Sequence, residues 1–235
     1  MPGPGFNLRA FKEAVDEQMS QLPDLRSFCD RCLRTERWRG SVVLMVVDAS
    51  FTSIGMSYLR AVVPSVLNFE RRFVRSGVIA SLRDLTEVPT RALKAVWKNE
   101  RSWAIAKGIA ETLTGLSSDD RSALRGWAER SSLSGMRDDP IGRLKGVGPV
   151  TFQYLRMMGG VDTVMPDKVV KKVLNEFIIK SGGVAPKGNV EFVETIEWLA
   201  RECGYRPVEL CWMTWLLTSD REVRVNYDTA ILERI

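Results

Sequence analysis

Histidine is absent from the 235-residue sequence, and this absence excludes several classes of active site. A Ser-His-Asp triad, a Cys-His pair and a histidine-ligated zinc ion all require an imidazole. Any acid-base chemistry must therefore come from Asp, Glu, Lys, Tyr or Cys side chains.

Cysteine is also scarce, with four in the chain. Cys29 and Cys32 have the C-x-x-C spacing of many metal and redox sites, but Cys203 and Cys211 do not form a second such pair. We therefore expect buried, reduced thiols and no metal, with a cysteine-metal interaction module as an alternative.

Long apolar runs are missing. The run at 42–47 is far shorter than the roughly 20 residues that cross a bilayer, so we expect no membrane span. The first residues have neither a basic leader nor an apolar segment, which predicts an intracellular protein of the cytoplasm, nucleoid or nucleus. The net charge of +5 is compatible with a polyanionic partner but does not require one.

Alternating strand patterns are scarce, whereas apolar residues recur at three- and four-residue spacing, so we predict an all-α fold. The segment 41–49 would also suit a buried strand, but we favour a helix; Pro64 should end or kink the helix that contains it. A strongly basic segment covers 26–38. Helices are expected at 9–19, 41–49, 56–73, 90–96, 102–113, 119–130 (after Ser117 and Ser118 as caps), 139–144, 150–158, 167–177, 191–202 and 208–217.

A glycine turn joins the expected helices at 139–144 and 150–158. Gly146 and Gly148 permit a tight hairpin whose amides face outward beside the positive end of the next helix, which suits a phosphate. Val147 would anchor the turn in the core. An ordinary corner between two helices is the alternative interpretation.

The sequence Leu-Lys-Gly-Val-Gly at 144–148, followed by an apolar helix and by Asp167 about two dozen positions after Leu144, resembles the helix-hairpin-helix (HhH-GPD) DNA glycosylase superfamily. The resemblance covers most of the chain and is specific from 144 to 173. It implies two helical lobes with a central cleft, and a hairpin at the cleft edge that holds a DNA phosphate, commonly with a bound monovalent cation.

The resemblance also implies the domain division and the partner. One lobe would be a helical barrel at 41–160 that includes the hairpin. The second would be discontinuous, with residues 1–40 and 161–235. The expected protein is a monomer that binds double-stranded DNA containing a damaged or mismatched base, and it uses no cofactor for catalysis.

Three departures from the family pattern narrow the expected activity. Val150 stands where the strand-cutting members have a lysine, so Schiff-base lyase chemistry is not expected. The four closely spaced C-terminal cysteines of the iron-sulfur members are missing, and Lys145 replaces the usual proline. The pattern is most similar to the alkylbase branch, which implies removal of an alkylated purine; removal of uracil or of mismatched thymine is the next alternative.

Asp167 is the expected catalytic residue, because an ionised carboxylate could stabilise positive charge at C1′ and activate water. Taken alone, Asp167 fits a helix N-cap better than a catalytic residue, and it is the spacing to the hairpin that favours the catalytic role; Asp162 is the second candidate carboxylate. A catalytically silent DNA-binding or repair-partner protein is the alternative function. The expected DNA-binding residues are Lys145, Gly146, Val147, Gly148, Thr151 and Lys168, and the base-pocket or wedge candidates are Ser50, Phe51, Trp97 and Trp103.

Overall fold

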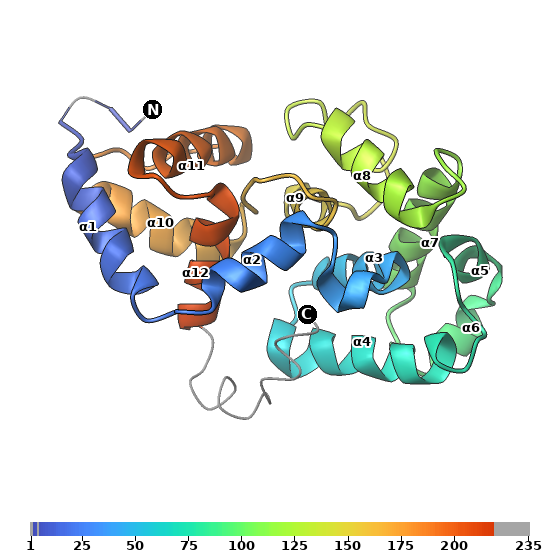
Figure 1. Cartoon of the computed structure of the whole chain (residues 1–235). Helices are drawn as coiled ribbons and strands as arrows, with labels where there is room; N and C mark the ends of the chain where they lie inside the picture. Colours follow the sequence, from blue (N-terminus) through green and yellow to red (C-terminus); the bar gives the residue numbers. More distant parts are fainter. Residues whose placement is uncertain (1, 4, 219–235) are drawn as a thin grey trace.

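The computed structural model describes residues 2–3 and 5–218, and this part of the chain is all-helical, as predicted (Figure 1). Within it, no helix combines the length and hydropathy needed to cross a bilayer. The α-helices are α1 (Leu8–Met19), α2 (Leu25–Leu33), α3 (Val42–Thr52), α4 (Val63–Phe69), α5 (Leu82–Glu87), α6 (Thr90–Leu93), α7 (Glu100–Thr114), α8 (Asp120–Arg130), α9 (Pro149–Met158), α10 (Lys168–Lys180), α11 (Asn189–Cys203) and α12 (Pro207–Thr218).

The apolar segment after Gly40 is a helix and not a strand. Ser41 starts α3 by accepting a hydrogen bond from the amide of Leu44, and all residues at 42–51 are buried. A helix that is apolar on every side belongs in a core, because it has no polar face to turn to solvent. Accordingly, α3 packs against both α7 and α9.

Pro64 does not end its helix. The helical segment η2 (Tyr58–Val62) runs directly into α4, and η3 (Glu70–Val74) continues it. The proline lies in the first turn of α4, where its missing N–H would have no partner in a regular helix. The expected single helix at 56–73 is therefore a chain of three short segments.

One expected helix is absent, and one N-cap differs from expectation. Residues 139–144 form consecutive turns, in which the Asp139 carboxylate accepts hydrogen bonds from the amides of Ile141 and Gly142, and not an α-helix. Asp119, and not Ser117 or Ser118, caps α8 through the amide of Ser122. Helices α2 and α5 have no counterpart among the expected helices, since the sequence indicated only a basic segment at 26–38.

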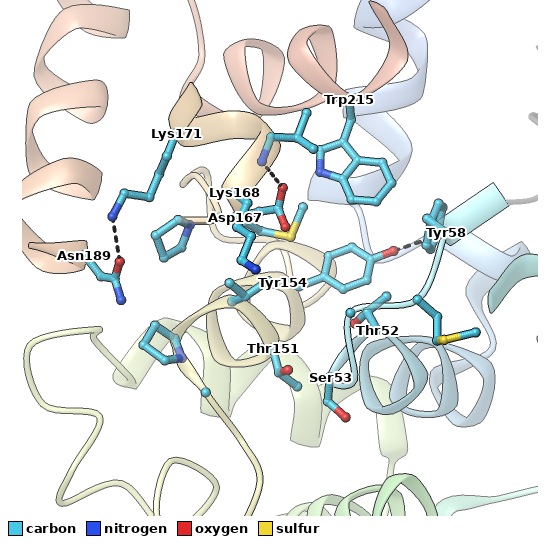
Figure 2. A pocket seen from close by; sticks show the side chains of 18 of the residues that line it. Thr52, Ser53, Tyr58, Thr151, Tyr154, Asp167, Lys168, Lys171, Asn189 and Trp215 are labelled. Atoms are coloured by element: carbon cyan, nitrogen blue, oxygen red, sulfur yellow. Dashed lines mark hydrogen bonds between the residues drawn. The ribbon is translucent and has the colours of Figure 1, made fainter. Parts of the chain in front are cut away.

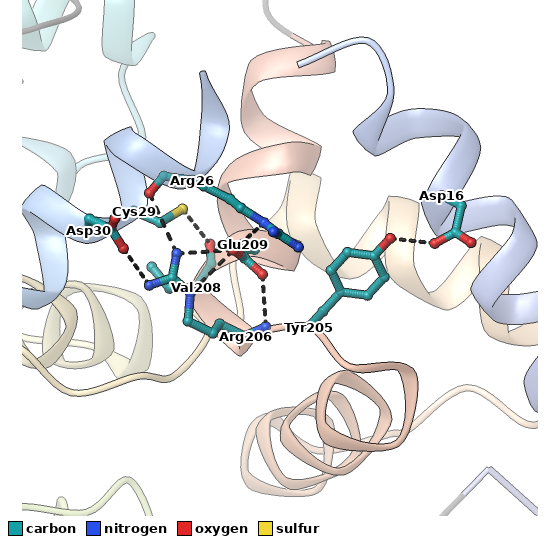
Figure 3. Close-up of polar contacts among 8 residues, drawn as sticks. All are labelled: Asp16, Arg26, Cys29, Asp30, Tyr205, Arg206, Val208 and Glu209. Carbon is teal, nitrogen blue, oxygen red and sulfur yellow. Dashed lines mark hydrogen bonds and ion pairs between the residues drawn. The ribbon is translucent and has the colours of Figure 1, made fainter. Parts of the chain in front are cut away.

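The N-terminal and C-terminal helices lie together. In Figure 1, α1, α2, α10, α11 and α12 lie on one side and α3–α8 on the other, and α9 packs against α2, α3 and α8. Arg206, just before α12, binds Asp30 of α2 at 2.6 Å and Glu209 at 3.0 Å (Figure 3). Tyr205 donates a hydrogen bond to Asp16 of α1. Residues 219–235 of the expected second lobe lie outside the described residues.

A fully buried ion pair lies where these helices meet. Arg37, in η1 (Arg37–Gly40), and Asp48 of α3 are both 0% exposed, with Nη2 and Oδ2 3.6 Å apart. Asp48 Oδ2 also accepts hydrogen bonds from Trp38 Nε1 at 2.8 Å, Tyr58 at 3.0 Å and Tyr154 at 2.8 Å. The guanidinium lies 4.6 Å from the ring centre of Trp212 on α12.

The ion pair perturbs the protonation of both partners. Burial by itself would lower the pKa of Arg37. Electrostatic interactions with Tyr154, Tyr58 and Asp48 raise it by more, so the pKa lies above its usual value and the guanidinium stays charged. Burial raises the pKa of Asp48, while Arg37 and the hydrogen-bond donors act in the opposite direction. Asp48 therefore depends on Arg37 to remain ionised.

Replacing Arg37 by methionine should reduce the free energy of unfolding by about 3–5 kcal/mol at neutral pH, because it leaves a buried carboxylate without its counter-ion. In the variant, the pKa of Asp48 in the folded state should rise further above the unfolded value near 3.9. The folded variant then binds the Asp48 proton more tightly than the unfolded chain does. Its free energy of unfolding should therefore be closest to that of the wild type in acid and should fall as pH rises through the folded pKa of Asp48.

Urea unfolding between pH 4 and pH 8 measures this prediction. The control is Arg39→Met, which removes the same charge from an exposed neighbour. The assigned role of the pair would be contradicted if Arg37→Met lowered the free energy of unfolding no more than Arg39→Met does. It would also be contradicted if the loss for Arg37→Met did not grow as pH rises.

Candidate functional site

A cavity of about 880 Å³ opens where the glycine turn at 145–148 faces the start of α10. Its wall is made by segments far apart in the sequence: the turn after α3, the first turn of α7, the glycine turn with α9, the start of α10, and α12. Its polar and aromatic lining residues include Arg101 and Trp212, and those labelled in Figure 2: Thr52, Ser53, Tyr58, Thr151, Tyr154, Asp167, Lys168, Lys171, Asn189 and Trp215.

Asp167 is both the N-cap of α10 and part of the cavity wall. Its Oδ1 accepts a hydrogen bond from the amide of Val169 at 2.7 Å, and its backbone is extended, as a cap requires. The side chain is half-buried, and among residues 2–3 and 5–218 it is the sole carboxylate that lines the cavity. Capping and exposure to the cavity are compatible, because the cap occupies one carboxylate oxygen.

The glycine turn contributes Gly146 and Gly148 to the same cavity. Gly146 has φ +106°, a conformation that side chains with a Cβ rarely adopt. Gly148 is the N-cap of α9 and has no side chain to satisfy the first amides of that helix. The turn therefore presents backbone to the cavity, and Thr151 of α9 lies just behind it, almost fully buried.

Four aromatic side chains form one continuous wall of the cavity. The ring centres of Tyr58 and Trp215 are 5.3 Å apart, those of Tyr58 and Tyr154 6.4 Å, and those of Tyr154 and Trp212 6.0 Å. Both tyrosine hydroxyls point to Asp48 at the back of this wall. The rings thus offer their hydrocarbon surfaces, and not their hydroxyls, to whatever fills the cavity.

The tyrosines cannot act as acids or bases near neutral pH. Burial raises the pKa of Tyr58 and of Tyr154 well above the usual value, although Arg37 acts against it. Asp167 is then the lining group that can accept a proton as a carboxylate.

Three cationic side chains line the same cavity as Asp167. Arg101 comes from α7, and Lys168 and Lys171 come from the first turn of α10. Lys171 donates a hydrogen bond to Asn189 at 3.1 Å (Figure 2). A polyanion is the kind of ligand that such a rim attracts.

The structure brings together some of the predicted site residues and not others. Gly146, Gly148, Thr151, Asp167 and Lys168 line the cavity. Val147 is buried beneath the turn, as expected of an anchor, and Lys145 is exposed outside the lining. Asp162 also lies outside it, where its carboxylate accepts a hydrogen bond from the amide of Val208 at the start of α12.

The four base-pocket or wedge candidates do not line the cavity. Phe51 stacks on Trp97 with ring centres 4.4 Å apart, and its edge meets Trp103. Ser50 is fully buried and donates a hydrogen bond to the carbonyl of Val46. These side chains belong to the packing of α3 against α7, and the expectation that they face a ligand is corrected.

The cysteines are free thiols, all buried. Burial raises the pKa of Cys29 above its usual value and that of Cys32 to about 11, so both are protonated at neutral pH. Cys29 donates a hydrogen bond to the carbonyl of Val208. Among the described residues, no group of three or more His, Cys, Asp or Glu could hold a metal ion.

The cavity residues that the sequence did not reveal are Tyr58, Arg101, Tyr154, Lys171, Trp212 and Trp215. One signal was available for the tryptophans, because Trp212 and Trp215 are three residues apart and so share a face of an aromatic-rich helix. Tyr58 and Arg101 carry no local signal, because their neighbours in the cavity come from distant segments.

No family model, curated protein or solved structure matches the chain.

The two glycines should respond differently to alanine. A Cβ on Gly146 would lie 2.7 Å from Arg101 Nε and 2.9 Å from Ile105 Cδ1, in addition to the strained φ, so Gly146→Ala should cost about 1–3 kcal/mol of stability. A Cβ on Gly148 meets nothing within 4 Å, and the φ of this residue is an ordinary −111°, so Gly148→Ala has no steric cost. Alanine is a poorer N-cap than glycine but restricts the unfolded chain more, so the net change in stability should stay below about 1 kcal/mol. Thermal unfolding of the two variants compares them directly, and equal losses would contradict the geometry of the turn.

Proposed function

We propose that the protein is a monofunctional DNA glycosylase, which hydrolyses the N-glycosidic bond of a damaged or mismatched base flipped out of duplex DNA into the cavity. The single observation that carries this proposal is the position of Asp167, which is, in the described part of the chain, the sole carboxylate lining a cavity that also has an aromatic wall and a glycine turn. The helix-hairpin-helix resemblance of residues 144–173 supports the same activity.

The cavity meets the chemical needs of base excision. A flipped base loses its stacking in the duplex and regains it on an aromatic side chain, here Trp215, the half-buried ring of the wall. Tyr58, Tyr154 and Trp212 are almost fully buried and support it from behind. Electron-rich ring faces favour a cationic base, so an alkylated purine is the first substrate to test.

Asp167 would act at the sugar. As the C1′–N bond breaks, positive charge develops at C1′ and the electron pair leaves with the base; the carboxylate stabilises that charge. Water then forms the new C1′–O bond and gives its proton to Asp167 Oδ2, since Oδ1 is engaged by Val169. The products are the free base and an abasic site in an intact strand.

The apolar wedge is reassigned. In place of Ser50 and Phe51, the cavity has Met56 at its edge, half-exposed in the turn after α3, next to Gly55 with φ +70°. An apolar side chain on a tight turn at the cavity edge is suited to fill the gap that a flipped base leaves in the duplex. No step of the proposal uses a cofactor.

The decisive test compares Asp167→Asn with Asp162→Asn. Asparagine caps helices as well as aspartate does, so both variants should fold. Base release from duplexes containing an alkylpurine, uracil, mismatched thymine or oxidised guanine is measured by chromatography, with duplex binding followed in parallel. Asp167→Asn should lose release by a factor of about 10² or more while binding persists, and Asp162→Asn should retain it.

Three results would contradict this proposal. Duplex binding by the wild type without release from any lesion would favour the catalytically silent DNA-binding alternative. Equal activity in the two aspartate variants would move the chemistry away from Asp167. Strand cleavage by the wild type would contradict the monofunctional mechanism.

Met56→Ala tests the wedge separately. Extrusion of a base from a duplex costs a few kcal/mol, so loss of the wedge should slow release from duplex DNA by about tenfold, equivalent to roughly 1.4 kcal/mol. Release from a single strand with the same lesion should be unaffected, because no gap has to be filled there. The exposed Val78, which lies outside the cavity, gives the control Val78→Ala. A similar loss on both substrates would exclude the wedge role.

A further inference from the structure

Arg101 occupies an unusual place beside the glycine turn. It is the second residue of α7, it is exposed, and it lines the cavity with Gly146 and Gly148. Its guanidinium lies so close to the turn that a Cβ on Gly146 would be 2.7 Å from Nε and 3.3 Å from Nη2. The missing side chain at position 146 thus makes room for the arginine.

Protein contacts do not account for this charge. Within the described residues, the Arg101 guanidinium makes no hydrogen bond and no ion pair. The adjacent Glu100 is engaged by Lys94 at 2.5 Å. A cation in the first turn of a helix also opposes the helix dipole, which is most favourable to anions there. Neither local pairing nor helix stability explains an arginine at this position.

The position of Arg101 beside Gly146 also affects whether the turn could bind the monovalent cation that the family resemblance implies at the hairpin. The carbonyl of Leu144 already accepts a hydrogen bond from the amide of Val147, and Arg101 puts a positive charge against Gly146. A metal cation would have to share this space with a like charge. The residues present therefore do not fit a bound cation at the turn.

We infer that Arg101 is a phosphate-binding residue, which holds a backbone phosphate of the bound DNA strand against the glycine turn and supplies there the positive charge that a metal cation would otherwise provide. This inference rests on the proposed DNA-binding function. The guanidinium offers paired N–H donors to phosphate oxygens, and the turn adds backbone amides from the opposite side.

The test measures binding of the full-length protein to a duplex with one abasic-site analogue, across a range of potassium chloride concentrations. Each lost phosphate contact lowers the slope of log K against log salt by about 0.9. Arg101→Gln should lower the magnitude of the slope by about one and weaken binding several-fold. The control is Arg83→Gln on α5, an exposed arginine outside the cavity lining, and it should leave the slope unchanged.

A second measurement replaces potassium by tetramethylammonium at equal ionic strength. Wild-type affinity should be the same in both salts, because Arg101 provides the charge. The inference would be overturned if Arg101→Gln had the same salt slope as the wild type, or if wild-type affinity required potassium. Neither outcome would contradict the glycosylase proposal. Absence of salt-dependent duplex binding by the wild type would instead remove the proposed function itself.

Discussion

Arg37 and Asp48 form an ion pair that is fully buried where α2, α3, α9 and α12 meet. Removing two ions from water costs several kcal/mol each, and their attraction compensates only when hydrogen bonds and geometry are good. Here Asp48 Oδ2 accepts three hydrogen bonds and the guanidinium packs over an aromatic ring, while Asp48 Oδ1, Arg37 Nε and Arg37 Nη1 have no hydrogen-bond partner among the described residues. The helices that supply these groups are therefore held in one arrangement, since a shift of any of them would expose an uncompensated charge.

This arrangement of helices also positions the aromatic wall of the cavity. Tyr58 follows α3 and Tyr154 lies in α9, and both hydroxyls are held by Asp48 on the side away from the cavity. Trp212 is fixed by the guanidinium behind it. The buried pair thus determines the place of an apolar wall whose aromatic rings meet edge to face. The acidic group and the cations come from other segments, the start of α10 and the first turn of α7.

The chemistry in the proposal is added to positions that already have structural roles. Asp167 caps α10 whether or not it meets a substrate, and Gly146 is needed for the turn whether or not the turn meets a phosphate. This overlap explains why stability and activity must be separated by experiment. Asparagine preserves the cap but not the negative charge, and alanine is tolerated sterically at Gly148 but not at Gly146.

The sequence by itself indicated the all-helical fold and the cavity residues Gly146, Gly148, Thr151, Asp167 and Lys168, because helix periodicity, N-caps and turn glycines act between residues near one another in the chain. It could not reveal that Phe51 packs into the core against Trp97, because a helix that is apolar on nearly every side does not show which of its apolar residues faces a ligand. It also could not join Tyr58, Arg101 and Trp212 to Asp167. Only the tertiary structure decided those neighbours, because long-range packing around a buried charge pair, and not local spacing, brings their helices together.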